Sequence, residues 1–161
     1  MTETDIPPYI VVGVDGSGYS AEALRAAVAQ ARLTGSAVHA VMAWQPPGLF
    51  SSVPSALEDA AEAAAGVARP MRTFQQQAEE ELAEAVRNAL GGEAPDFVRA
   101  TVVQGSPAQA LLEAAEGAQL LAVGSRGYGG FRGLLLGSVS QHVAQYAHCS
   151  VLIVREPRPA D

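Results

Sequence analysis

Short apolar runs alternate with longer amphipathic segments along this chain. The runs are rich in β-branched residues and are closed by glycine, proline, serine or aspartate, which is typical of buried strands that end in turns. The first run ends at Asp15-Gly16-Ser17-Gly18, and the second ends at Pro46. Five strands are therefore predicted, over residues 9–14, 37–44, 97–103, 120–123 and 151–154.

The segments between these runs have the periodicity of helices. Either Ser17 or Ser20 can cap the first helix, and Gly35 ends it. Pro107 stands at the first position of a helix that extends to about Glu116. Two more helices are predicted over residues 69–90 and 138–147. The apolar positions that define the first helix are Ala21, Leu24, Ala27, Val28 and Ala31, and those of the helix over 69–90 are Phe74, Leu82, Val86 and Leu90.

Strands that alternate with helices predict an α/β fold, with a doubly wound parallel sheet covered on both faces. We expect one domain over residues 1–156 and a disordered tail over 157–161. Residues 46–55 are predicted to form a loop, and the alanine-rich residues 56–68 a helix or a mobile segment. In such folds ligands bind at the carboxyl ends of the strands. The loop that carries Asp15 and the loop after residue 123 should meet there.

The segment over residues 124–140 is the most informative part of the chain. It contains Gly124-x-x-Gly127, nine further residues, and then Gly137-Ser138. The segment lies between a predicted strand and a predicted helix, with Ser138 expected as the helix N-cap. Glycines allow backbone N–H groups to approach an anion, and a helix N-terminus adds unpaired donors. The segment therefore predicts a phosphate-binding loop.

This spacing, together with Asp15 at the end of the first strand, closely resembles the universal stress protein family, in the subgroup that binds ATP. The resemblance covers nearly the whole chain, including the final strand that follows Cys149. It implies a Rossmann-like, adenine nucleotide α-hydrolase-like sheet of strand order 3-2-1-4-5. It also implies that Gly127, Gly137, Ser138 and Ser140 hold phosphates, whereas Val123 and Gly124 approach the ribose.

Other positions are assigned by combining this resemblance with local chemistry. Asp15 is expected to contact the ribose or adenine end, or to organise an Asx-turn, or both. The backbone of Ala43, or of Val41, is expected at the adenine edge, and Arg126 and Arg132 either neutralise phosphates or extend into solvent. The predicted nucleotide-binding residues are Gly13, Val14, Asp15, Ala43, Val123, Gly124, Arg126, Gly127, Gly137, Ser138, Val139 and Ser140.

Composition narrows the function further. The net charge of −7 argues against binding to nucleic acid, which requires a basic surface. All ten basic residues are arginine, so a Walker or Schiff-base lysine is absent. The single cysteine favours a reducing compartment, and we expect a cytoplasmic protein without a leader peptide or a membrane span. His39, His142 and His148 lack metal-binding spacing.

The segment Gly16-Ser17-Gly18-Tyr19-Ser20-Ala21 also fits the dinucleotide fingerprint G-x-G-x-x-A. That fingerprint requires an acidic residue at the end of the second strand, where this chain has Met42-Ala43-Trp44-Gln45. The fingerprint is therefore interpreted as fortuitous.

The function predicted from the sequence is a nucleotide-dependent stress sensor or regulator that binds ATP, with Mg²⁺ carried on the phosphates. Phosphoryl transfer requires a positioned base, and no carboxylate is expected near the γ-phosphate, so slow or no hydrolysis is predicted. The alternatives are a slow ATPase or phosphotransferase, a cyclic AMP-binding family member and a purely structural module. A homodimer is expected through the edge strand from Val151 to Val154, in the manner common in the family.

Overall fold

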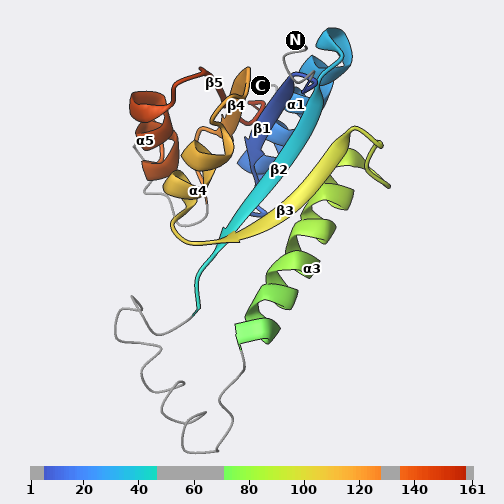
Figure 1. Ribbon diagram of the computed structural model, residues 1–161, viewed down its shortest axis with the longest axis vertical. Helices are drawn as coiled ribbons and strands as arrows, with labels where there is room; N and C mark the ends of the chain where they lie inside the picture. Colours follow the sequence, from blue (N-terminus) through green and yellow to red (C-terminus); the bar gives the residue numbers. More distant parts are fainter. Residues whose placement is uncertain (1–5, 47–70, 128–134, 159–161) are drawn as a thin grey trace, which may run out of the picture.

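Five parallel strands form a single sheet in the computed structural model, which describes residues 6–46, 71–127 and 135–158 (Figure 1). The strand order is β3-β2-β1-β4-β5, as expected. The register pairs Gly13 of β1 with Val41 of β2, and Val12 of β1 with Ala122 of β4. The strands are β1 (Tyr9–Gly13), β2 (Ala37–Trp44), β3 (Val98–Gln104), β4 (Leu120–Gly124) and β5 (Ser150–Val154).

Four described helices cover the two faces of the sheet. They are α1 (Gly18–Thr34), α3 (Met71–Leu90), α4 (Pro107–Ala114) and α5 (Ser138–Tyr146). Helices α1 and α3 pack on one face, and α4 and α5 pack on the other (Figure 1). The prediction of a doubly wound α/β fold is confirmed.

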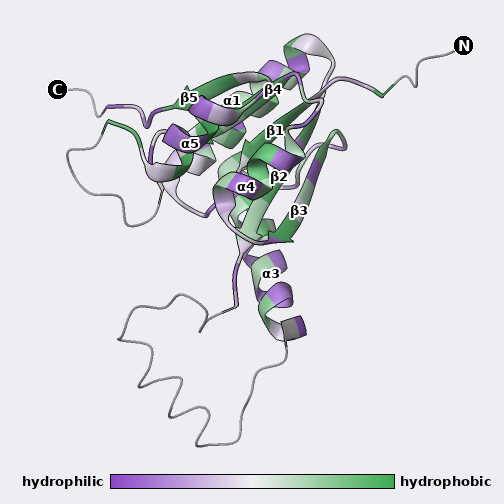
Figure 2. Ribbon diagram, turned by 60° about the vertical axis from the view of Figure 1, so that its left-hand side comes forward, coloured by the Kyte–Doolittle hydropathy of each residue, from purple (hydrophilic) through white to green (hydrophobic). Residues whose placement is uncertain are grey.

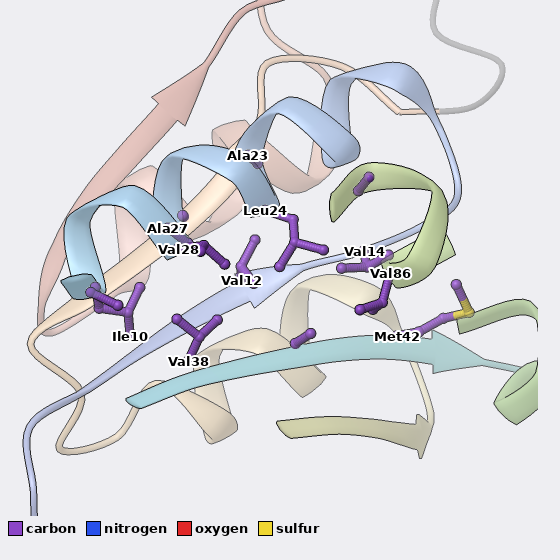
Figure 3. Close-up of a cluster of buried hydrophobic side chains, with 14 of the residues drawn as sticks. Ile10, Val12, Val14, Ala23, Leu24, Ala27, Val28, Val38, Met42 and Val86 are labelled. Atoms are coloured by element: carbon purple, nitrogen blue, oxygen red, sulfur yellow. The ribbon is translucent and has the colours of Figure 1, made fainter. Parts of the chain in front are cut away.

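Successive side chains of the central strands point to opposite faces of the sheet and therefore belong to two separate hydrophobic cores. Ile10, Val12 and Val14 point toward α1 and α3, where Leu24 of α1 packs among them (Figure 3). Val11 and Leu121 point the other way, toward α4 and α5. Hydrophobic colouring accordingly follows the strands, whereas α3 carries many hydrophilic residues (Figure 2). Both faces of β1 and β4 are buried, which explains their continuous apolar runs.

The predicted boundaries hold to within a few residues. Ser17 is the N-cap of α1, and its side chain accepts a hydrogen bond from the backbone N–H of Ser20. Gly35 ends the same helix in the left-handed conformation, with φ 68°. Helix α4 stops at Ala114, short of the expected Glu116, because Gly117 turns the chain at φ 82°.

Several predictions fall outside the described residues. These are the loop and helical segments predicted between residues 47 and 68, the first two residues of the helix predicted over 69–90, and the last three residues of the tail. Pro157 and Arg158, which are described, are exposed and belong to neither a helix nor a strand. None of the helices in the described ranges combines the length and hydropathy needed to span a bilayer.

Replacement of Leu24 by alanine tests the core between α1 and the sheet. Leu24 is fully buried, so Leu24→Ala should lower the free energy of unfolding by about 2–5 kcal/mol. Leu33 lies on the same helix and is 83% exposed, so Leu33→Ala should change stability by less than about 0.5 kcal/mol. Urea denaturation followed by circular dichroism measures both. Equal effects of the two substitutions would contradict this packing.

Candidate functional site

A pocket of about 490 Å³ opens at the carboxyl ends of β1 and β4. These two strands are adjacent in the sheet, but their crossovers run in opposite directions, so the loops that leave them diverge and form a crevice. The volume is in the range of small-molecule binding sites. The lining residues are Gly13, Val14, Asp15, Ser20, Val41, Ala43, Pro107, Leu111, Val123, Gly124, Arg126, Gly127, Gly137, Ser138, Val139 and Ser140.

All twelve residues that the sequence predicted for the site line this one pocket. Their contact with a nucleotide stays a prediction. The sequence reasoning did not assign Ser20, Pro107 and Leu111 to the site. Pro107 opens the helix that follows β3, so its place at the carboxyl edge of the sheet was a usable signal. Leu111 lies one turn farther along α4, and its position depends on how α4 packs on the sheet.

The two ends of the segment 124–140 are joined through the backbone of Ser125. Its N–H donates to the carbonyl of Val154 at 2.7 Å, which continues the pairing of β4 with β5 by one residue. Its carbonyl accepts from the N–H of Gly137, also at 2.7 Å. The start of α5 is thereby held against the end of β4. Residues 128–134, which include the predicted Arg132, are outside the described ranges.

Gly137, and not Ser138, is the N-cap of α5, which corrects the sequence prediction. The first helical hydrogen bond runs from the N–H of Gln141 to the carbonyl of Gly137 at 3.0 Å. The chain must pass within van der Waals reach of Arg126 here, since a Cβ on Gly137 would lie 3.3 Å from the Arg126 Cα. Glycine therefore takes the cap position, and Ser138 becomes the first helical residue.

The N-cap residue of α5, Gly137, has no side chain that could accept a hydrogen bond from the first turn. By helix geometry, the N–H groups of Ser138, Val139 and Ser140 have no acceptor within the helix. All three residues line the pocket. The positive end of the α5 dipole therefore faces the pocket, with N–H donors that have no acceptor within the helix.

The hydroxyl of Ser140 has a structural role. It is almost completely buried, and it donates to the carbonyls of Gly137 at 3.0 Å and Ser125 at 3.2 Å. The hydroxyl thus reinforces the closure of the segment. The phosphate contact predicted for Ser140 would therefore use its N–H group.

Asp15 organises the turn after β1, which agrees with the Asx-turn expected from the sequence. Its Oδ1 accepts hydrogen bonds from the Ser17 N–H at 2.9 Å and the Ser17 hydroxyl at 2.5 Å. Gly16 permits this turn at φ 82°. Asp15 Oδ2 also lies beside the other loop, because a Cβ added to Gly127 would be only 2.6 Å from it. The carboxylate is therefore closer to Gly127 than its assignment to the ribose or adenine end suggested.

The backbone of Ala43 is better placed than that of Val41 for an adenine edge. The carbonyl of Val41 already accepts from the N–H of Val14 at 2.9 Å. Pairing between β1 and β2 ends at Gly13 and Val41, so Ala43 lies beyond the last pair. Residues two apart along a parallel strand present their backbone groups to the same neighbouring strand. The groups of Ala43 therefore face the pocket, where β1 has ended.

His39, His148 and Cys149 do not line the pocket. His39 contacts Thr101 across β2 and β3; burial lowers the pKa of His39, and the charge of Arg99 lowers it further. His148 pairs with Glu116 at the surface. Burial raises the pKa of the Cys149 thiol. Within the described ranges there is no group of three or more His, Cys, Asp or Glu side chains that could hold a metal ion.

Residues 9–155 match the model of the universal stress protein family. A universal stress protein of Mycobacterium tuberculosis is 36% identical over 147 residues, which cover 91% of this chain and 45% of that protein. The chain thus spans about half the length of that relative. A universal stress protein of Thermus aquaticus is 36% identical over 148 residues, which cover 91% of this chain and 97% of that protein.

Solved structures of similar proteins share this architecture. A universal stress protein from Lactobacillus plantarum has a TM-score of 0.67 at 18% identity, and the match covers 92% of this chain and 97% of that one. A universal stress protein solved in complex with cAMP has a TM-score of 0.61 at 29% identity, over the same shares of the two chains.

Two glycines of the pocket make a matched test of its walls. A Cβ on Gly124 would lie 2.8 Å from the backbone carbon of Tyr19, whereas the atom nearest to a Cβ on Gly13 would be a δ-methyl of Leu111, at the same distance, with the other δ-methyl and a Val123 methyl at 3.4 and 3.5 Å. Gly124→Ala should therefore lower the free energy of unfolding by about 1–3 kcal/mol. Gly13→Ala should cost less, about 0.5–1.5 kcal/mol, because Leu111 can change rotamer. Urea denaturation measures both, and a larger loss for Gly13→Ala would contradict the geometry.

Proposed function

Because the chain belongs to the universal stress protein family, we propose that it binds an adenine nucleotide in this pocket, with ATP as the preferred ligand. The observation that carries the proposal is the start of α5, where three N–H groups without helical partners line the pocket. Such a helix N-terminus favours phosphate groups through both its donors and its dipole.

A comparison with α1 supports this choice of anion site. Helix α1 also begins at the carboxyl edge of the sheet, but its first turn is capped from within the chain by the Ser17 side chain. The cap of α5 is a glycine and supplies no side-chain acceptor. Of these two helix starts, α5 is therefore the one whose donors an external anion can satisfy.

The rest of the pocket suits the other parts of a nucleotide. Ala43 offers backbone groups to the adenine edge, and Val41, Leu111 and Val123 provide apolar walls. The Asp15 carboxylate accepts hydrogen bonds, so it suits the hydroxyls of the ribose. Arg126 also lines the pocket and can offset the charge of the phosphates. Mg²⁺ would be carried on the phosphates.

We propose a sensing or regulatory role in the cytoplasmic stress response, with slow or no hydrolysis of ATP. Asp15 is the one carboxylate that lines the pocket in the described ranges, and its Oδ1 is engaged by Ser17. General-base activation of a water requires a carboxylate positioned for that purpose. Cyclic AMP is the second candidate ligand, because a family member 29% identical to this chain was solved in complex with cAMP.

Replacement of Ser138 by proline tests the anion site directly. Proline lacks the N–H donor but is favoured at the first helical position, and Gly137 before it already has the extended ψ of 169° that a proline requires. Ser138→Pro should weaken ATP binding by about tenfold or more, since hydrogen bonds to charged groups contribute about 1.5–3 kcal/mol.

Isothermal titration with Mg-ATP measures this effect, and Ser138→Ala is the matched control because it keeps the N–H and removes only the hydroxyl. Titration with cAMP in parallel identifies the preferred ligand, and phosphate release measures hydrolysis. Unchanged ATP affinity in Ser138→Pro would contradict the anion site. Rapid turnover would contradict a purely regulatory role.

We also propose a homodimer through the exposed edge of β5. The Ser125 N–H donates to Val154, so backbone groups at alternate residues of β5 face β4. Those of Val151 and Ile153 consequently face outward, where an antiparallel partner strand can pair with them.

Val151→Pro removes one outward N–H and should convert the dimer to a monomer in light scattering at micromolar concentration. Val151→Ala keeps that N–H and should stay dimeric, and a monomeric unmodified protein would refute the proposal.

A further inference from the structure

A short network of hydrogen bonds fixes the Asp15 carboxylate in the pocket. Both the N–H and the hydroxyl of Ser17 donate to Asp15 Oδ1, at 2.9 and 2.5 Å. The Ser20 hydroxyl accepts from the Asp15 N–H at 3.2 Å and donates to the Ser17 carbonyl at 3.0 Å. The Ser20 N–H returns to the Ser17 hydroxyl at 3.2 Å. The network thus links three residues through both backbone and side chains.

The two serines of this network are buried, whereas the carboxylate that they support is exposed. Ser17 is 7% and Ser20 is 4% exposed, and Asp15 lines the pocket. Buried hydroxyls with defined partners hold a single geometry, because any other orientation leaves a buried polar group unsatisfied. The support of Asp15 is therefore rigid on the side away from the pocket.

Capping of α1 explains only half of what Ser17 does. An N-cap side chain needs an acceptor, and aspartate or asparagine supplies one as well as serine does. The Ser17 hydroxyl also donates its proton to Asp15, which an aspartate at that position could not do. This donated bond is the part of Ser17 that acts on the pocket.

With Oδ1 held by Ser17, the other oxygen of the carboxylate is directed across the pocket. Asp15 Oδ2 lies beside Gly127, at 2.6 Å from the position of an added Cβ. An ionised carboxylate only accepts hydrogen bonds, so a ligand group that meets it must be a donor. On a nucleotide whose phosphates lie at the start of α5, the sugar hydroxyls are such donors.

We propose that Ser17 is a positioning residue that acts through Asp15 and sets the selectivity of the pocket for nucleotides with free sugar hydroxyls. The inference rests on the proposed nucleotide binding. Because Ser17 fixes the carboxylate before the ligand arrives, binding does not have to order that side chain. The contribution of Ser17 should therefore appear only for ligands that carry the hydroxyls.

The test compares ATP with 2′,3′-dideoxy-ATP by isothermal titration on the full chain. The unmodified protein should bind ATP roughly tenfold or more tightly than the dideoxy analogue, because a bond to a charged acceptor is lost. Ser17→Gly removes the hydroxyl and keeps an acceptable N-cap. It should weaken ATP binding by about tenfold and leave the affinity for the analogue within about twofold. Ser17→Thr retains the hydroxyl and should restore the preference.

A second variant keeps the test valid if Ser17→Gly does not fold. Ser17→Ala removes the hydroxyl without the added backbone freedom of glycine, although it weakens the cap of α1. It adds no charge, and a weaker α1 cap affects the two triphosphates alike, so the ratio of the affinities for ATP and the dideoxy analogue isolates the hydroxyl contribution. That ratio should fall toward one. In addition, Ser17→Gly combined with Asp15→Ala should bind ATP no more weakly than Asp15→Ala alone.

The outcomes separate this inference from the proposal beneath it. If the unmodified protein binds neither ATP nor the analogue, nucleotide binding and the role of Ser17 are both overturned. If it binds ATP and Ser17→Gly binds equally well, only the role of Ser17 is overturned. Equal weakening toward both ligands, or additive effects of Ser17 and Asp15, would show that Ser17 acts through the general stability of α1 and would also overturn the inference.

Discussion

The backbone of Ser125 is the connection on which the rest of the pocket depends. Its N–H pairs with Val154 of β5, and its carbonyl accepts from the Gly137 N–H and the Ser140 hydroxyl. These bonds are shielded from water, since Ser125 is 4% exposed. They set the distance between the end of β4 and the start of α5. The donors at the start of α5 face the pocket because this closure holds the helix in place.

The fold was predictable because its signals are local and repeat along the chain. Apolar runs such as residues 120–123 mark strands buried on both faces, and helical periodicity fills the gaps between them. Parallel connectivity then places every strand–helix loop at one edge of the sheet. For this reason Asp15 and Gly127, more than a hundred residues apart in sequence, could be assigned to one pocket before their contact was known. Strand order came from the family resemblance and not from the pattern.

The finer features of the pocket depend on distances that a sequence pattern does not contain. Periodicity placed Ser138 at the start of a helix but did not show that Gly137 must pass close to Arg126, which makes Gly137 the cap. Ser140 was assigned to phosphates, yet its hydroxyl turns inward to the Ser125 carbonyl. Leu111 enters the pocket only because α4 packs over Gly13. Each of these features is set by packing between elements distant in sequence.

The two halves of the pocket are stabilised in different ways. The turn from Asp15 to Ser20 is held by hydrogen bonds within six consecutive residues, whereas the other half is closed across the long segment between Ser125 and Gly137. The halves touch where Asp15 lies beside Gly127 and where Gly124 lies against Tyr19, but the bonds that close the long segment are separate from the hydrogen bonds that Ser17 gives to Asp15. A related chain can lose the closure, and with it the anion site, while the turn persists unchanged. Conservation of the turn is then a poor marker of phosphate binding, and the spacing after β4 is the feature to use when relatives are sorted by ligand.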